Sequence, residues 1–339
     1  MPIAKKRGNN YRTRYDVYDE NGKRHQKSVT ASTKKEAERI AAMNKPSSRN
    51  DINFGQAVNR YIESKTNVVK PSTIKGYRTI ERNYLGSLKL IKLSRINNEL
   101  IQNQINIIAG DKDPKTVDNT RALISSVLKM FLPDFQLIVK TPAKIKKEVK
   151  IPTDEELKSL LDAAAGRREE VPIMLAAFGS LREGEISALM PDCVHDDYIS
   201  IRRSYSQADD NTWILTETPK TEAGYRDIPL PPQVMTKVKE LVKEYTGDDF
   251  GITGLKPNQI RSRFETTRKK AGVNVKFHAL RHYFASFLHA NGRPDKTIAK
   301  LGGWEDVSTL RKIYQHSTHN AEAAAAADIA EKFEKITNL

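Results

Sequence analysis

The segment from Phe277 to Tyr283 constrains the fold more than any other part of the sequence. It contains His278 and Arg281, and an α-helix brings residues spaced three apart onto one face. A fixed cation beside a group that hydrogen-bonds or moves a proton suits a reacting phosphate. Downstream, the hydroxyl of Tyr314 can act as a nucleophile. A His-x-x-Arg spacing alone is more often structural, so its companions in the sequence decide its meaning.

The charge balance points to a polyanionic partner. The chain has 339 residues and a formal charge of +15, from 57 Lys and Arg against 42 Asp and Glu. Attraction of this kind to nucleic acid is mostly phosphate electrostatics, and the alternative is a solvated basic surface. The single cysteine, Cys193, excludes an internal disulfide and a Cys-rich zinc site. The apolar runs are too short for a membrane span, and no signal-peptide apolar region is found, so we expect a reducing, intracellular compartment.

Residues 1–48 are the most basic segment, with twelve Lys and Arg against five Asp and Glu, a net +7. From Tyr11 to Tyr18 the side chains alternate, which places Arg12 and Arg14 together on one face of a strand. We expect a three-stranded sheet with one helix, whose Arg12 and Arg14 face can lie in a DNA groove. The alternative is a small charged hairpin that contacts protein.

Turn and cap signals divide this segment. Residues 21–22, Asn-Gly, are a strong hairpin turn signal. Residues 33–36, Thr-Lys-Lys-Glu, form a capping box that starts a helix to about Met43. Residues 45–50 have the composition of a linker.

Residues 51–145 are expected to be almost entirely helical. Apolar residues recur there at helical spacing in one stripe: Phe54, Ala57, Val58, Tyr61 and Ile62. Further helices are expected from Pro71, over 98–108 and over 115–132. Three basic residues on the second helix or at its start, Lys70, Lys75 and Arg78, can follow a phosphate backbone, although each alone is more simply a solvated charge. A Lys-dense bridge over 141–150 ends this part.

Residues 150–339 are expected to mix helices with short strands. A capping box at residues 153–156 starts a helix, and another begins at Pro172. Strands are expected near 198–205, 212–217 and 225–229, and helices from about Lys256 to the end, including the alanine run 321–327. The whole chain is therefore predicted to be a multidomain protein, mainly α with small β elements.

Three further residues can complete a phosphate site. With Ser180 as N-cap, Arg182 would lie in the first turn of a helix, where free N–H groups favour an anion; it can instead pair with an acidic neighbour. Lys220 is expected at the tip of a β-hairpin spanning 218–230, where it can protonate a departing alkoxide or simply be solvated. Trp304 follows two glycines, and its indole N–H can donate to a phosphate oxygen, unless it is an ordinary packed aromatic.

The order and spacing of these residues resemble the tyrosine recombinase family, and within it the phage and conjugative-transposon integrases. The resemblance rests on Arg182, Lys220, the pair His278 and Arg281, Gly303-Trp304 and Tyr314. It extends over essentially the whole chain, so that residues 1–48 resemble an arm-site-binding domain, 51–145 a helical core-binding domain and 150–339 an α+β catalytic domain. Many members have histidine where this chain has Trp304, which leaves the role of that residue open.

The resemblance implies a mechanism. Tyr314 would attack a DNA phosphate to give a 3′-phosphotyrosyl bond, while Arg182 and Arg281 hold the non-bridging oxygens in bidentate geometry. Lys220 would protonate the leaving 5′-oxygen, and His278 would either accept the tyrosine proton or hydrogen-bond the phosphate. No metal and no nucleotide cofactor are expected.

The partners implied are double-stranded DNA with core and arm attachment sites, three further copies of the chain in a tetramer, an excisionase and a DNA-bending protein. The expected location is the cytoplasm of a bacterial host, on its chromosome. The tail from His319 to Leu339 would dock on a neighbouring protomer or close its own domain. The rival functions are a type IB topoisomerase, a catalytically silent DNA-binding regulator and a metal-dependent nuclease.

Overall fold

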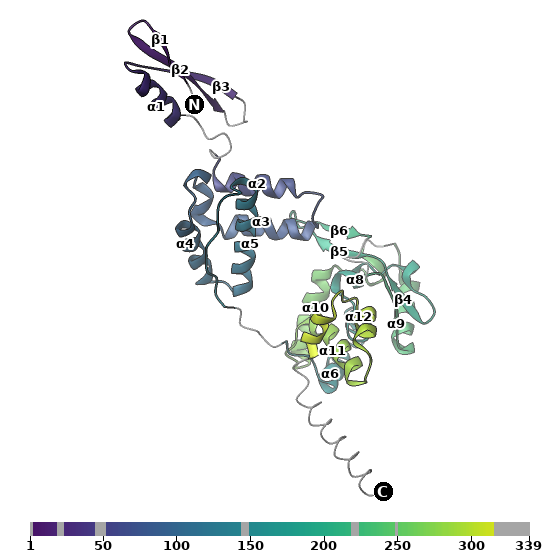
Figure 1. Ribbon diagram of the computed structural model, residues 1–339. Helices are drawn as coiled ribbons and strands as arrows, with labels where there is room; N and C mark the ends of the chain where they lie inside the picture. Colours follow the sequence, from purple (N-terminus) through teal and green to yellow (C-terminus); the bar gives the residue numbers. More distant parts are fainter. Residues whose placement is uncertain are drawn as a thin grey trace, which may run out of the picture. The chain divides into compact units, whose positions relative to one another are not determined.

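The computed structural model describes residues 3–18, 24–44, 52–143, 149–217, 224–247 and 250–314 (Figure 1). They form two compact units, residues 1–145 and 146–339, and each is described by itself below. The architecture is mainly helical with small antiparallel sheets, which confirms the predicted fold class. The predicted division of the first unit between residues 48 and 51 remains a prediction.

The N-terminal part of the first unit is a three-stranded antiparallel sheet with one helix. Its elements are β1 (Lys5–Arg7), β2 (Asn10–Tyr18), β3 (Arg24–Ala31) and α1 (Lys34–Asn44). The backbone N–H of Glu36 donates to the Thr33 hydroxyl at 3.3 Å, so the helix begins at the predicted cap. Thr13 is buried, whereas Arg12 and Arg14 on either side of it are exposed. The predicted alternation of β2 is therefore confirmed.

The rest of the first unit is a cluster of four helices with two short 3-10 turns, Gly86–Leu90 and Leu93–Arg95. The helices are α2 (Phe54–Ser64), α3 (Pro71–Asn83), α4 (Asn98–Ala109) and α5 (Pro114–Phe131). Three side chains cap these helices: Asn53, Asn97 and Asp113 accept N–H groups of the first turns. The predicted apolar stripe of α2 is buried in the core of this cluster.

The second unit surrounds helix α11 with other helices and carries two small sheets. Its helices are α6 (Asp154–Ala164), α7 (Glu170–Gly179), α8 (Glu183–Ser187), α9 (Pro232–Glu244), α10 (Pro257–Lys270), α11 (Phe277–Ala290), α12 (Asp295–Gly302) and α13 (Val307–Tyr314). Its strands are β4 (Tyr198–Ile201), β5 (Ser204–Gln207), β6 (Trp213–Thr216) and β7 (Arg226–Pro229). Helix α11 packs on α7 and also contacts α13. Helices α10 and α12, which are labelled near it in Figure 1, contact it too.

The expected hairpin over 218–230 lies partly outside the described residues, because residues 218–223 are not described. Its described strand β7 pairs with β4, and β6 pairs with β5. The pairing of β4 with β7 places Ile199, Ile201 and Ile228 in the core. The sequence pattern predicted no helix between residues 229 and 256, yet α9 forms there, and Pro232 fits its first position.

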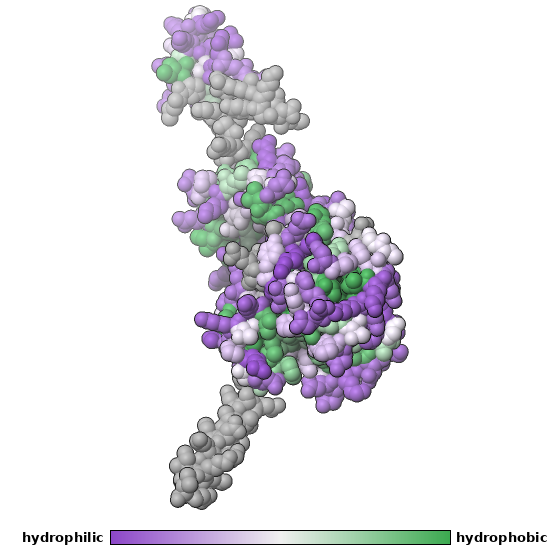
Figure 2. Space-filling model, turned by 90° about the vertical axis from the view of Figure 1, so that its right-hand side faces the viewer, coloured by the Kyte–Doolittle hydropathy of each residue, from purple (hydrophilic) through white to green (hydrophobic). Residues whose placement is uncertain are grey.

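Several predicted elements lie outside the described residues. They are the turn at 21–22, the linker at 45–50, Lys220 and the alanine run at 321–327. No helix among the described residues is long and apolar enough to cross a membrane. In the face seen in Figure 2, hydrophilic side chains cover most of the coloured surface, with a few apolar patches between them.

Gly251, in the segment after α9, packs against the segment that follows α8. Its φ of 58° is left-handed, and a Cβ atom there would lie 2.4 Å from the carbonyl oxygen of Leu189. The next residue, Ile252, donates its N–H to that same oxygen at 2.9 Å. Gly272 is equally left-handed, with φ of 68°, but nothing lies within 4 Å of its Cβ position.

We therefore expect Gly251→Ala to destabilise the second unit more than Gly272→Ala does. The left-handed backbone alone costs an alanine about 1–2 kcal/mol, and at Gly251 the Leu189 carbonyl must also move. Both tryptophans, Trp213 and Trp304, lie in this unit, so urea unfolding followed by tryptophan fluorescence reads its stability specifically. Equal losses in the two variants would contradict the proposed backbone contact.

Candidate active site: an arginine cluster around one carboxylate

A left-handed turn at Ser180 directs the chain from α7 into the candidate site. Ser180 has φ of 55° and ends α7, and α8 begins at Glu183 with Arg182 in the N-cap position. The predictions that Ser180 is the N-cap and that Arg182 lies inside the first turn are therefore wrong. A residue in the left-handed conformation cannot take the extended backbone of an N-cap. Glu185 satisfies the helix start instead, because its carboxylate accepts the backbone N–H of Arg182 at 3.0 Å.

The Glu185 carboxylate is the centre of the site. It accepts Nη1 of Arg182 at 2.7 Å and Nη2 of Arg226 at 2.9 Å, and the residue is only 5% exposed. Burial by itself would raise the pKa of Glu185, but the charges of Arg226, Arg182 and Arg281 lower it to about 2. The carboxylate is therefore ionised at neutral pH, and it fixes two arginines from different elements.

Main-chain carbonyls hold the guanidinium group of Arg281. Its Nη1 donates to the carbonyl of Ser180, and its Nη2 donates to the carbonyl of Gly303 at 3.4 Å. The same two carbonyls serve the other arginines, since Arg226 donates to Ser180 at 3.3 Å and Arg182 to Gly303 at 3.1 Å. Gly303 is the left-handed C-cap of α12. The two acceptors thus come from the left-handed ends of two helices.

The cluster has more positive than negative charge. Arg182, Arg226 and Arg281 surround the single carboxylate of Glu185, which leaves an excess of two positive charges among these four residues. Burial and then the charge of Arg182 lower the pKa of Arg281, which is 1% exposed. The side chain of Arg182 is 44% exposed and opens the cluster to solvent. An anion bound at Arg182 would offset the repulsion, so the arrangement suits a phosphate.

Trp304 packs its ring against Arg281. The guanidinium carbon lies 4.1 Å from the ring centroid, and Trp304 is 8% exposed. This is a cation–π contact that holds the arginine in place. A Cβ atom on Gly302 would lie 1.7 Å from Cζ3 of this ring, so the glycine makes room for it. The packed-aromatic alternative thus accounts for the ring, and donation by the indole N–H remains a prediction.

His278 lies one turn before Arg281 on α11, as predicted, and its side chain is exposed. Partial desolvation, and then the charges of Arg281 and Arg182, lower its pKa below the ordinary 6.5. The imidazole is therefore neutral at neutral pH and can accept a proton. His282 lies one turn further, with its ring centroid 4.8 Å away and nearly perpendicular, and burial lowers its pKa to about 4.

Two predicted catalytic residues fall wholly or partly outside the described part of the chain. Tyr314 is the last residue of α13, a helix that contacts α11, but its side chain is not among those described. Lys220 lies in the undescribed segment between β6 and β7. Arg182 and Arg281 are 99 positions apart in the sequence, yet both donate to the carbonyl of Gly303 in the cluster.

Arg226 belongs to the cluster too, although its sequence context did not lead to a predicted role. Its side chain is only 2% exposed and donates Nε to the carbonyl of Leu301 at 3.0 Å, besides its bonds to Glu185. A signal for it was present, because residues 226, 228 and 230 share one face of a strand and Ile228 and Leu230 are apolar. An arginine that lies on the same strand face as core residues is expected to be buried, and a buried cation needs hydrogen-bond or ion-pair partners.

The predicted DNA-contacting residues occupy the first unit. Arg12 and Arg14 lie on the exposed face of the sheet, and Nη2 of Arg12 donates to the Ser28 hydroxyl at 2.6 Å. Lys70 is the N-cap residue of α3, while Lys75 and Arg78 are half-buried within that helix. Arg78 donates to the side chain of Asn59. The structure brings the last three onto one helix and keeps the first two on the sheet.

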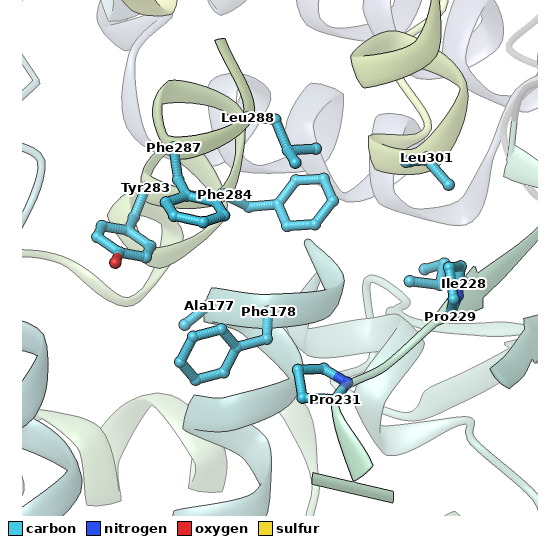
Figure 3. A pocket seen from close by; sticks show the side chains of 10 residues that line it. All are labelled: Ala177, Phe178, Ile228, Pro229, Pro231, Tyr283, Phe284, Phe287, Leu288 and Leu301. Atoms are coloured by element: carbon cyan, nitrogen blue, oxygen red, sulfur yellow. The ribbon is translucent and has the colours of Figure 1, made fainter. Parts of the chain in front are cut away.

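The second unit also has an apolar pocket that offers no group for catalysis. The pocket lies between α7, β7, α11 and α12, with Phe178, Phe284, Phe287 and Leu301 among its walls (Figure 3). The hydroxyl of Tyr283, the polar group at its edge, already donates to Asp154 at 2.7 Å. Across the described ranges, no group of three or more His, Cys, Asp and Glu side chains is arranged to hold a metal ion.

Comparison with known proteins places this unit in a family. The sequence model described as Phage integrase family matches residues 150–321. A protein called "Tyrosine recombinase XerC-like" from Caldanaerobacter subterraneus is 25% identical over 354 residues, which cover 88% of this chain and 90% of that protein. A "Putative prophage phiRv2 integrase" from Mycobacterium tuberculosis is 23% identical and covers 61% of this chain and 59% of its own length.

Solved structures share the fold at low identity. The integrase of transposon Tn1549, in complex with transposon right end DNA, superposes with a TM-score of 0.65 at 17% identity, over 82% of this chain and all of that one. A lambda integrase dimer bound to a COC′ core site gives 0.60 at 16% identity, over 92% of this chain and 94% of that one. With the family match over half of the sequence, the chain belongs to the phage integrase family and is a tyrosine recombinase, an enzyme of site-specific DNA recombination.

Proposed function

We propose that the arginine cluster around Glu185 binds the scissile phosphate of DNA, and that Tyr314 attacks it. The observation that carries the proposal is the excess positive charge of the cluster, with Arg182 open to solvent beside it. Arg182 contacts the phosphate directly, while Arg281 and Arg226 stabilise the negative charge that builds on its oxygens. Glu185 keeps the arginines in register and does not react.

Bond making and breaking then fall to three residues. The Tyr314 hydroxyl forms a 3′-phosphotyrosyl bond as the 5′-oxygen departs. Lys220 supplies the proton for that oxygen, and the neutral imidazole of His278 accepts the tyrosine proton or hydrogen-bonds the phosphate. The indole N–H of Trp304 adds a further donor. Attack by the 5′-hydroxyl of a second strand on the phosphotyrosine reverses the step and exchanges strands. The arginines of the cluster stabilise the negative charge on the phosphate oxygens, so the proposed reaction needs no added cofactor.

The assembly proposed is a tetramer on two DNA segments. A related structure is described as a lambda integrase tetramer bound to a Holliday junction, with a TM-score of 0.57 at 16% identity over 90% of this chain. Residues 1–48 bind arm sites, residues 51–145 bind the core site, and residues 150–339 carry out the chemistry. An excisionase and a DNA-bending protein act as accessory factors, on the chromosome in the cytoplasm of a bacterial host.

Replacing Tyr314 with Phe tests the nucleophile. The ring stays and the attacking oxygen is lost, so DNA binding should persist while the covalent adduct disappears. The measurement is adduct formation on a nicked suicide duplex built from the DNA that flanks the gene. Tyr283→Phe is the matched control, because that hydroxyl donates to Asp154 and lies outside the cluster. Adduct formation by the Tyr314 variant at the wild-type rate would falsify the assignment.

Replacing Arg281 with Lys tests the clamp. A lysine keeps the charge, but it lacks the planar fork whose two nitrogens reach the Ser180 and Gly303 carbonyls separately and whose face packs on Trp304. Cleavage should fall by roughly a hundredfold to a thousandfold, as for the loss of one preorganised donor. The rate of adduct formation measures this, with exposed Arg293→Lys as the control. A rate within about threefold of wild type would make Arg281 structural.

The exposed face of the N-terminal sheet can be tested in the full chain. Arg12→Gln with Arg14→Gln removes two charges from that face, so the slope of log affinity against log salt for a long, arm-containing site should become shallower by about two. Cleavage of a short core duplex should be unchanged. Lys34→Gln with Lys35→Gln on the exposed surface of α1 removes the same charge elsewhere. If both pairs weaken binding equally, overall charge and not the sheet face is responsible.

A further inference from the structure

A second basic surface adjoins the arginine cluster. It is a hollow of about 760 Å³ between β7, the residue after β4 and helix α12, and we call it the α12 groove. The side chains that define it are Arg202, Tyr225, Arg226, Asp227, Lys296 and Lys300. Of the residues proposed for cleavage chemistry, Arg226 lines this groove.

The groove is strongly positive. Its one carboxylate, Asp227, is already engaged, since it accepts the Ser200 hydroxyl at 2.6 Å and Nη2 of Arg202 at 2.9 Å. Lys296 and Lys300 are spaced by four residues on α12, so they share one face of the helix, and both are exposed. Within the described parts of the chain, neither lysine has a carboxylate at ion-pair distance. The two ammonium groups are therefore available to an anionic ligand.

The groove and the cluster share a wall. Arg226 lines the groove, and its guanidinium group donates to Glu185 at 2.9 Å inside the cluster. The C-terminal end of α12 makes the second connection, because the Leu301 carbonyl accepts Nε of Arg226 while the Gly303 carbonyl accepts Arg182 and Arg281. Successive phosphates of one DNA strand are about 3.4 Å apart along the helix axis. A strand with one phosphate at Arg182 therefore has further phosphates within reach of a neighbouring groove.

We infer that the α12 groove binds the backbone of the DNA strand beside the scissile phosphate, through Lys296 and Lys300. The inference rests on the proposed function and adds a second phosphate contact to it. Lysine is suited to this role, because a compact ammonium neutralises a backbone phosphate without reading the base sequence. The contact would also involve α12, at whose C-terminal end the Leu301 and Gly303 carbonyls accept hydrogen bonds from the three arginines.

The test combines a charge-neutral variant with charge-neutral DNA. Lys296→Gln with Lys300→Gln is made in the full chain, and Lys269→Gln with Lys270→Gln, at the exposed end of α10, is the matched control. The probe is a core-site duplex in which single phosphates flanking the cleavage point are replaced, one at a time, by uncharged methylphosphonates. Binding is measured over a range of salt concentrations, and tryptophan fluorescence confirms that each variant is folded.

For wild type and the control pair, neutralising one or two phosphates beside the cleavage point should weaken binding. The groove variant should bind unmodified DNA more weakly, with a salt slope shallower by about two, and should lose nothing more when those phosphates are neutralised. A groove variant that responds to every methylphosphonate as wild type does would overturn the inference. So would one that binds and cleaves normally but no longer assembles into a tetramer, since the groove would then face an acidic protein surface. If wild type binds this duplex but forms no covalent adduct, the proposed chemistry is wrong. The groove is tested by binding alone, so its result remains valid in that case.

Discussion

The arrangement of the second unit depends on one buried carboxylate shared by more cations than it can neutralise. Glu185 pairs with Arg182 on its own turn and with Arg226 on β7, while Arg281 on α11 is held nearby by main-chain oxygens. Removing a carboxylate from such a group would leave buried cations unpaired, which is costly. The carboxylate therefore joins α8 to β7 and still leaves the charge that a phosphate requires.

Desolvation and then the charge of the neighbouring groups lower the pKa of both histidines. The lowered pKa of His278 comes partly from desolvation and partly from the neighbouring arginines, and that of His282 is lowered to about 4. A bound phosphate would counter the arginine contribution and raise the pKa of His278 again. The imidazole is thus neutral before DNA binds and accepts a proton more readily once a phosphate is present. This order suits a group that takes the proton of an attacking hydroxyl.

Local signals in the sequence predicted the helices well, and long-range packing decided what they missed. The Thr33 and Thr153 caps act within one turn of chain, so their patterns carry over directly to the structure. The role of Ser180 was mistaken, because a serine at a helix start and a serine in a left-handed turn have the same local sequence. The strand pairing after residue 198 depends on which isoleucines reach the core, which is a long-range property that a local pattern does not contain. His278, Arg281 and Arg182 were named in advance, whereas Arg226 acquires its role only from contacts with Glu185 and α12.

Two left-handed helix ends place the carbonyls of Ser180 and Gly303 against the arginines. A carbonyl belongs to the main chain, so a substitution that keeps the turn leaves the acceptor in place whatever side chain follows. A carbonyl also orients a guanidinium group without neutralising its charge, whereas a second carboxylate would neutralise it. The positions of these acceptors are therefore set by the shape of two turns, and only the guanidinium groups depend on which side chains are present.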